Sequence, residues 1–202
     1  MSINNKCFCG SNNNYSYCCQ PYINNKQTQQ AFPQTPEQLM RSRFSAYASG
    51  NSQYIYDTYA KSSQASQSVE DINDWSKACV WIALEIHSTN NGDNTLNDSP
   101  EQFVEFSAFY ITEDTLFELR ENSRFVLEGS MKDNAENNTE NNAEANSQNF
   151  QWRYIDGDII KHCQLATIKR KELCPCNNYP TTWLIKKGKK FKQCCGKLCF
   201  NK

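Results

Sequence analysis

Two groups of four cysteines, one near each end of this 202-residue chain, constrain its fold more than any other feature. In both groups a Cys-x-Cys pair is followed by two adjacent cysteines. The first group is Cys7, Cys9, Cys18 and Cys19, and the second is Cys174, Cys176, Cys194 and Cys195. Four thiolates form the usual ligand set of a closed tetrahedral zinc site. The pattern therefore predicts one or two Zn²⁺ ions per chain, each held in a small knuckle.

A disulfide scaffold is the alternative use for these thiols. Adjacent cysteines such as Cys18 and Cys19 rarely bridge each other, because disulfide geometry strains an ordinary peptide link. Residues 1–6 contain no apolar signal segment, and no run approaches the roughly twenty apolar residues of a membrane span. We therefore expect a cytoplasmic, reduced protein whose paired thiols hold metal. The remaining cysteines are Cys79 and Cys163, expected to be ordinary thiols, and Cys199, which is close enough to the second group to substitute as a ligand.

Gly10 and Ser11 follow the first Cys-x-Cys pair and predict the sharp turn that brings both cysteine pairs to one ion. Glycine tolerates positive φ, and serine can hydrogen-bond its own backbone. In the second group Asn177 and Asn178 stand at the same place, and the segment 179–185 is inserted before the adjacent cysteines. The second site thus keeps its ligands but has a degenerate turn.

Charge is distributed unevenly along the chain. From Lys169 onward there are ten Lys and Arg against the single acid Glu172, whereas the preceding residues have eleven Lys and Arg against twenty-one acids. A basic tail suggests an anionic partner, either an acidic protein face or ribosomal RNA. The acidic body and the lack of an evident recognition helix argue against sequence-specific DNA binding. The expected contact residues are Trp183, Lys186, Lys187, Lys189, Lys190, Phe191 and Lys192.

Three helices are predicted in the first half of the chain. Thr35 can cap a helix that begins at Pro36, Gln38 can complete a capping box, and Gly50 can end the helix in the left-handed conformation. Apolar residues recur at helical spacing between these signals. Weaker patterns predict further helices over 52–60 and 69–77.

The period then changes from helical to two, which predicts strands over 80–87, 102–112, 115–128 and 150–154. Asp156 and Gly157 are expected to turn the chain after the last strand. Helices followed by antiparallel strands indicate an α+β fold, in which a curved sheet wraps around helices. The Asn- and Glu-rich run at about 132–149 is expected to be a disordered insertion without a function of its own.

These features divide the chain into an N-terminal knuckle at 1–22, a linker at 23–34, a central domain at 35–165 and a C-terminal knuckle at 170–199. Three stretches carry a resemblance to a known family: Cys-Phe-Cys-Gly-Ser from Cys7, Pro-Glu-Gln-Leu-Met-Arg-Ser-Arg-Phe-Ser-Ala-Tyr from Pro36, and Trp-Arg-Tyr-Ile-Asp-Gly from Trp152. In these motifs the chain resembles the bacterial YchJ family.

The resemblance implies SEC-C zinc motifs, named for the C-terminus of the SecA translocation ATPase, at the ends of a SnoaL-like or steroid-isomerase-like cone. It implies no activity, because the family is biochemically uncharacterised. Many relatives carry a histidine where this chain has Phe117 and Glu118.

A cone of this type keeps its chemistry in the pocket between sheet and helix. Arg41 and Arg43 are two residues apart on a helix, so at most one of them lines this pocket. Glu105 is either a buried base or, on an alternating strand, a solvent-facing residue. The possible pocket residues are Arg43, Tyr47, Trp81, Glu105, Tyr110 and Arg124, with Arg41, Glu118 and Tyr154 as further candidates. None of them is identified as catalytic by the sequence.

Two functions of different classes fit the sequence. In the first, the protein is a zinc-binding adaptor whose cone spaces two knuckles and whose basic knuckle contacts a protein or ribosomal partner. In the second, the cone is a small-molecule-binding or enzymatic pocket, and the zinc sites only stabilise it. A cavity that contains a perturbed acid or base would favour the second function, and a cavity filled by Trp and Phe would count against it.

Overall fold

The fold is known from a computed structural model, which describes residues 6–24, 31–89, 101–129, 150–184 and 188–200. The predicted insertion at 132–149 lies outside the described residues, and so does part of the predicted linker.

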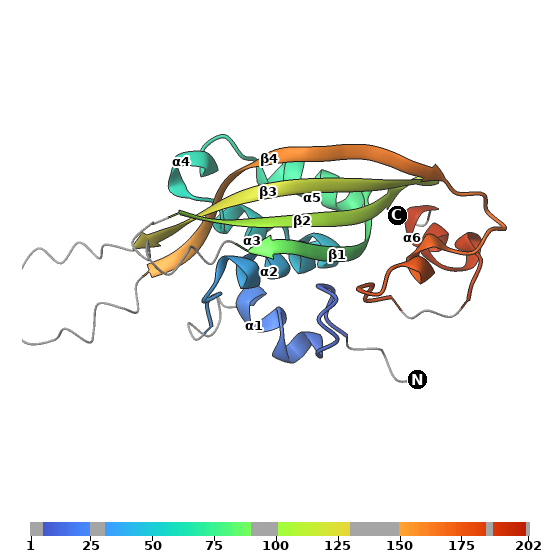
Figure 1. Cartoon of the computed structure of the whole chain (residues 1–202), viewed down its shortest axis with the longest axis horizontal. Helices are drawn as coiled ribbons and strands as arrows, with labels where there is room; N and C mark the ends of the chain where they lie inside the picture. The colour runs from blue at the N-terminus through green and yellow to red at the C-terminus, as the bar shows by residue number, and fades with distance from the viewer. Residues whose placement is uncertain (1–5, 25–30, 90–100, 130–149, 185–187, 201–202) are drawn as a thin grey trace, which may run out of the picture.

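A four-stranded antiparallel sheet forms the middle of the molecule (Figure 1). The strands lie in chain order and are β1 (Val80–Thr89), β2 (Glu101–Thr112), β3 (Thr115–Gly129) and β4 (Phe150–Thr167). Glu113 makes the short turn between β2 and β3 with φ of 56°. The period-two prediction places β1, β2 and β3 correctly, and the predicted α+β class is confirmed.

The prediction for β4 was wrong, because this strand continues through the expected turn to Thr167. Register shifts between Arg124 and Phe125, and between Arg120 and Glu121, leave extra residues in β4 on both sides of Gly157. Bulges of this kind bend a strand without ending its pairing. Asp156 and Gly157 therefore mark a bent section of β4 rather than a hairpin.

The main helix, α2 (Pro36–Ser49), begins and ends as its sequence predicts. Thr35 Oγ1 accepts a hydrogen bond from Gln38 N at 3.2 Å, and Gly50 ends the helix with φ of 75°. Gln38 reaches back beyond the capping-box position, since its Oε1 accepts from Gln34 N at 2.7 Å. These contacts satisfy N–H groups that have no partner within the helix.

Three shorter helices follow α2, namely α3 (Ser52–Asp57), α4 (Lys61–Gln64) and α5 (Val69–Ala78). The second predicted helix ends early because the chain pairs with β4 instead. Ala60 N donates to Tyr154 O at 2.7 Å, and Tyr154 N donates to Thr58 O at 3.0 Å. The knuckles add η1 (Tyr15–Tyr17) and α1 (Gln20–Ile23) at one end, and η4 (Pro175–Asn178), η5 (Phe191–Gln193) and α6 (Cys195–Phe200) at the other.

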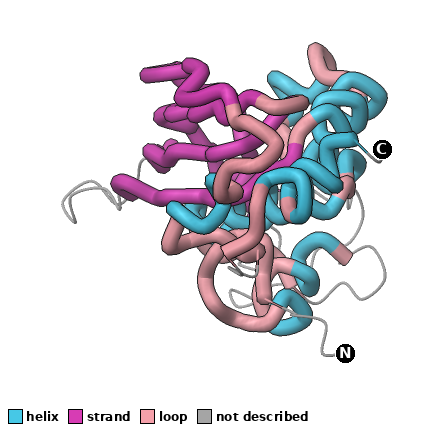
Figure 2. Tube along the Cα trace, turned by 90° about the vertical axis from the view of Figure 1, so that its right-hand side faces the viewer, coloured by secondary structure: helices cyan, strands magenta, loops and turns pink. Residues whose placement is uncertain are grey.

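The sheet is covered on one face and partly covered on the other. On the helix face, side chains such as Phe106, Tyr110 and Phe125 pack against Leu39 and Phe44 of α2. On the other side, here called the outer face, alternate residues of β1 and β2 form a second core with the C-terminal knuckle: Val80, Ile82, Phe109 and Ile111. Figure 2 shows most helices gathered on one side of the strands. The cone thus supports helices on one face and the C-terminal knuckle on part of the other.

Candidate metal sites and the cone cavity

The N-terminal cysteines converge as their spacing predicts. Their four Sγ atoms all lie within 4.8 Å of one another, with Cys9 and Cys18 at 3.7 Å and Cys18 and Cys19 at 3.9 Å. A disulfide requires about 2.05 Å, which excludes a Cys9–Cys18 bond. Four sulfurs bonded to one Zn²⁺ at about 2.3 Å lie about 3.8 Å apart. The observed spacing therefore fits a tetrahedral metal ion.

The turn between the two cysteine pairs depends on Gly10. This residue has φ of 77°, and its N–H donates to Cys7 O at 3.2 Å. Ser11 Oγ lies 3.3 Å from Cys18 Sγ. Hydrogen bonds from Cys19 and Cys9 lower the pKa of the Cys7 thiol far below its ordinary value. The same contacts raise the pKa of Cys19, so without metal the cluster favours thiolate at Cys7 and a protonated thiol at Cys19.

Helix α2 anchors this knuckle to the cone. Arg41 donates to Cys9 O at 3.3 Å, and the buried Ser45 hydroxyl lies 3.6 Å from Cys7 Sγ. Arg43, two residues from Arg41, points instead into the cone, where it is 4% exposed. The prediction that only one of these arginines lines the pocket is confirmed.

The C-terminal cysteines also converge, although their turn differs from the first. Their Sγ atoms lie within 4.8 Å of one another, with Cys176 and Cys194 at 3.6 Å. Asn177 N donates to Cys174 O at 3.1 Å, the same bond that Gly10 makes in the first knuckle. The Asn177 side chain accepts a hydrogen bond from Gly188 N at 3.3 Å. Asn177 thus forms the turn and also links it to Gly188 by a hydrogen bond.

The remaining cysteines do not join either group of four converging sulfurs. Cys79 is buried and lies 3.5 Å from the Thr112 hydroxyl. Cys163 is partly buried, and Cys199 packs against the C-terminal cluster.

The inserted segment joins the two knuckles to each other and to the sheet. The Trp183 ring packs edge-on against Phe8 at 4.6 Å, and its indole N–H donates to Trp81 O of β1 at 2.9 Å. A Cβ atom on Gly10 would lie 2.1 Å from Thr181 O, so the two backbones are in close contact. Tyr179 packs against Phe109 on the outer face at 4.3 Å. The residues 179–184 of this segment, here called the bridging loop, are therefore structural.

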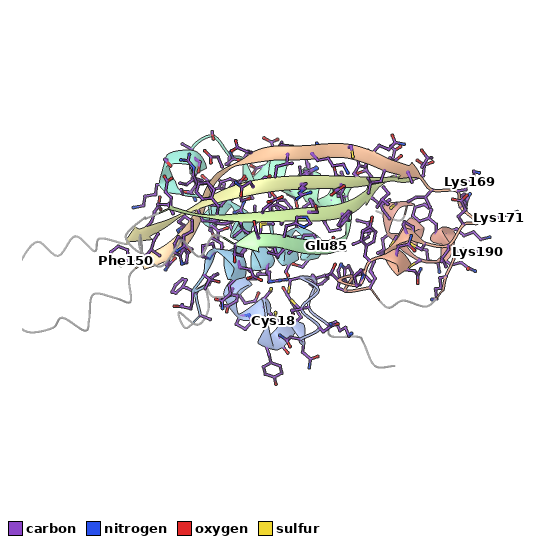
Figure 3. All side chains as sticks on the ribbon, in the orientation of Figure 1. Cys18, Glu85, Phe150, Lys169, Lys171 and Lys190 are labelled. Atoms are coloured by element: carbon purple, nitrogen blue, oxygen red, sulfur yellow. The ribbon has the colours of Figure 1, made fainter. Side chains whose placement is uncertain are left out.

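Two of the predicted partner contacts are engaged within the protein, Phe191 fully and Trp183 in part. Phe191 is completely buried beneath the C-terminal cluster, and Trp183 is held in the bridging loop. Lys189, Lys190 and Lys192 are exposed, as expected. Figure 3 shows Lys169, Lys171 and Lys190 projecting from this end of the molecule. Lys186 and Lys187 lie outside the described residues.

Half of the predicted pocket residues line the cavity between α2 and the helix face, here called the cone cavity. These are Arg43, Tyr47 and Trp81, together with the further candidate Tyr154. Tyr110 lies beside the cavity, its ring 5.2 Å from that of Trp81.

Glu105 and Arg124 do not line the cavity, because both belong to ion pairs on the outer face; for Glu105 this is the outward-facing alternative. Glu105 accepts from Arg120 at 2.8 Å, and Arg124 donates to Asp156 at 2.7 Å. Glu118 is also on this face, where Lys161 donates to it at 2.6 Å.

Sequence reasoning missed Glu121, the carboxylate that does line the cone cavity. It shares strand parity with Leu119, Ser123 and Phe125, so the alternation of β3 could have placed it on the helix face. Its Oε1 accepts from Ser123 Oγ at 2.6 Å and from the Tyr154 hydroxyl at 2.9 Å. Burial and the nearby Glu121 charge raise the pKa of Tyr154 far above its ordinary value, so this phenol remains a hydrogen-bond donor.

A larger cavity of about 570 Å³ lies between α1, α3 and the beginning of β4. Two of its polar side chains have partners within the protein: Trp152 Nε1 donates to Gln34 O at 3.1 Å, and Arg153 donates to Asp57 O at 3.2 Å. Burial lowers the pKa of Arg153.

In the described part of the chain, no helix is both long and apolar enough to cross a membrane.

Comparison with known proteins supports the same architecture. Residues 35–157 match the family described as "YchJ, middle NTF2-like domain". A UPF0225 protein of Vibrio cholerae is 38% identical over 192 residues, which cover 94% of this chain and 99% of that protein. A UPF0225 protein of Serratia proteamaculans is 32% identical over 95% of this chain and 97% of its own length.

Two solved structures are also similar. A SEC-C motif-containing protein from Psychrobacter arcticus matches with a TM-score of 0.61 and 25% identity, over 95% of both chains. A SEC-C motif-containing protein from Rhodopseudomonas palustris matches in fold with a TM-score of 0.57 and 21% identity, over 77% of this chain and 99% of that one. The matching central domain, the near full-length relatives and the cysteine clusters agree, and this chain belongs to the YchJ (UPF0225) family.

Proposed function

We propose that this protein is a zinc-dependent adaptor, whose C-terminal knuckle binds an acidic face of another protein. The observation that carries the proposal is the charge of that knuckle. Exposed basic side chains surround the buried cysteine cluster: Lys169, Arg170, Lys171, Lys189, Lys190, Lys192 and Lys197. Among the described residues of the knuckle, Glu172 is the acid that opposes them, paired with Lys169 at 3.7 Å.

Zinc would organise this surface rather than perform chemistry. The ligands would be the four cysteines of each cluster, and a site with four protein ligands has no open position for substrate. Lys189 and Lys190 lie on the segment that pairs with the cysteine turn, through Cys174 N to Lys189 O at 2.9 Å. A metal-organised turn therefore fixes where these lysines project.

A protein partner is favoured over RNA by the apolar side chains of the same knuckle. Leu173 is 55% exposed and Leu198 is 45% exposed. Specific protein interfaces combine an apolar centre with a charged rim. Single-stranded RNA is bound on exposed aromatic rings, whereas Phe191 of this knuckle is buried and the partly buried Trp183 packs against Phe8.

Site-specific photocrosslinking tests the proposal. We expect p-benzoylphenylalanine at position 173 to form adducts with protein in cell extract. Position 150 is the matched control, because Phe150 is equally exposed at 55% and lies at the opposite end of the molecule (Figure 3). Adducts at 173 should disappear in high salt, because salt screens the charges of the knuckle. They should also disappear after a chelator removes zinc, because the metal orders the knuckle.

Charge reversal provides a second comparison. The double substitution Lys171→Glu with Lys190→Glu should abolish the adducts, while Lys61→Glu with Lys77→Glu, the same charge change elsewhere, should leave them. Adducts that are sensitive to ribonuclease would show an RNA partner instead. Adducts that persist after zinc removal would contradict a zinc-dependent surface.

A further inference from the structure

The cone cavity contains a hydrogen-bond donor that the protein does not use. The cavity has a volume of about 130 Å³ and is lined by aromatic rings, including Phe44, Trp75 and Phe106. Trp81 also lines it and is 4% exposed. The indole N–H of Trp81 is buried and has no hydrogen-bond partner among the described residues. By contrast, the indole groups of Trp152 and Trp183 both donate to backbone carbonyls.

A buried donor without an acceptor is unfavourable, so such groups in native proteins usually have an acceptor, supplied by the protein, an ordered water or a ligand. Trp81 is held in place on several sides, with the Tyr47, Trp75 and Tyr110 rings 5.0, 5.0 and 5.2 Å away. The ring is therefore unable to turn its N–H toward solvent without displacing neighbours. An acceptor has to enter the cavity.

The charges of the cavity are already balanced. Arg43 donates to Ile55 O and Thr58 Oγ1, each at 2.8 Å, and lies 4.5 Å from the centres of the Tyr59 and Tyr154 rings. Its charge opposes that of Glu121, and the two groups have opposite effects on Tyr47 and Tyr154. A charged ligand would disturb this balance, whereas a neutral one would not.

Glu121 offers the complementary group to a ligand. Its Oε1 is occupied by Ser123 and Tyr154, but no described residue donates to its Oε2. Gly157 makes this placement possible, because a Cβ there would lie 2.1 Å from the Glu121 carboxylate. The cavity thus presents one unused donor and one unused acceptor between flat aromatic walls.

We propose that the cone cavity binds a small neutral nitrogen heterocycle, whose acceptor atom takes the Trp81 indole N–H and whose own N–H donates to Glu121. The volume sets the size, since a cavity of about 150 Å³ holds one benzene molecule. The ligand is accordingly a single ring of about five to seven non-hydrogen atoms. Entry is past Trp75, which lines the cavity and is 37% exposed. This site is independent of the proposed adaptor surface.

The test uses 2-pyridone as a probe, because it is a neutral ring with adjacent carbonyl and N–H groups. It is titrated into ¹⁵N-labelled, zinc-loaded full-length protein. We expect a saturable shift of the Trp81 indole resonance, while those of Trp152 and Trp183 remain in place. Benzene, which has the shape without the polar atoms, should bind at least about tenfold more weakly, as expected for lost hydrogen bonds.

Variants separate binding from folding. Trp81→Phe should weaken 2-pyridone binding about tenfold, and Trp152→Phe should leave it unchanged. Ala108→Leu fills the cavity from β2 and should abolish binding while the Trp81 resonance stays visible, which covers the case in which Trp81→Phe does not fold. No saturable shift at the solubility limit of 2-pyridone would overturn the proposal. So would a water-to-indole NOE that persists in excess 2-pyridone, since ordered water would then be the acceptor.

Discussion

Gly10 is the residue at which the two knuckles meet. Its φ of 77° places it in the left-handed region, and its missing side chain lets Thr181 O approach to within contact distance. Gly50 has nearly the same φ, 75°, but open space beside it. Comparing substitutions at Gly10 and Gly50 therefore separates the cost of a left-handed backbone from the cost of a steric clash.

We predict that Gly10→Ala destabilises the protein by about 3 kcal/mol, while Gly50→Ala costs about 1 kcal/mol. Both substitutions strain the left-handed backbone, but the first also forces the bridging loop away. Chemical denaturation of the zinc-loaded protein measures both values. Equal losses would show that the Gly10 contact with Thr181 contributes nothing.

Glu118 gives the protein a pH-dependent contribution. Partial burial alone would raise the pKa of Glu118, but hydrogen bonds from Lys161 and Ser107 outweigh it and hold the pKa below its ordinary value of 4.5. The folded protein thus favours the ionised carboxylate more than the unfolded chain does. Its stabilisation is complete above pH 4.5 and is lost as the pH falls through the lowered pKa.

We therefore predict that Glu118→Gln is less stable than the wild type near neutral pH, and that the difference shrinks below pH 4.5. Unfolding of both proteins by urea from pH 7 to pH 3 checks this. Metal loss in acid affects both proteins alike and cancels in the difference. A difference that does not change with pH would mean that Glu118 acts through packing alone.

Among the elements, the bridging loop makes the contacts that the sequence predicted least well. It interrupts the cysteine pattern, and so it appeared as a defect of the second site. In space it connects Phe8 of one knuckle, β1 and Phe109 of the outer face. Contacts between residues so far apart in the chain have no periodic signature, which is why local patterns could not predict them.

We predict that Trp183→Ala lowers stability by about 3 kcal/mol and speeds zinc release, because it exposes Phe8 and removes the bond to β1. Trp152→Ala is the control, since it removes a tryptophan that also donates to a backbone carbonyl. Transfer of zinc to a chromogenic chelator measures the rates. Unchanged zinc release in Trp183→Ala would show that the loop does not protect the first site.

Elements with regular patterns were the more predictable ones. Thr35 and Gly50 set the limits of α2 through hydrogen bonds within a few residues, and alternation set β2 and β3. In β4 the local turn signal of Asp156 and Gly157 was overridden by pairing with β3, which is a tertiary effect. Glu105 was harder to place, because both alternating sets of β2 contain aromatic residues, and only packing against α2 shows which set faces inward.

At the scale of the whole molecule, two cysteine clusters that could each hold a metal ion lie near the ends of a chain whose middle has its own core. Both sets of four sulfurs lie within 4.8 Å of one another despite their different turns. We predict two zinc ions per chain by elemental analysis of the purified protein. Cys9→Ser and Cys176→Ser should each leave one ion, because three thiolates bind far more weakly than four. One ion in the wild type would show that the Asn177 turn does not support binding, and none would overturn both sites.

The bridging loop is synthesised long after the first knuckle, which it contacts in the folded protein. Trp183 is made 175 residues after Phe8, because 183 minus 8 is 175. At about 5–20 residues per second this is a delay of roughly 9–35 s on the ribosome. Throughout that interval the four N-terminal thiols have emerged without the loop that later packs beside them. Translation thus gives the first cluster a period of access to metal before the bridging loop packs against Phe8 and Gly10.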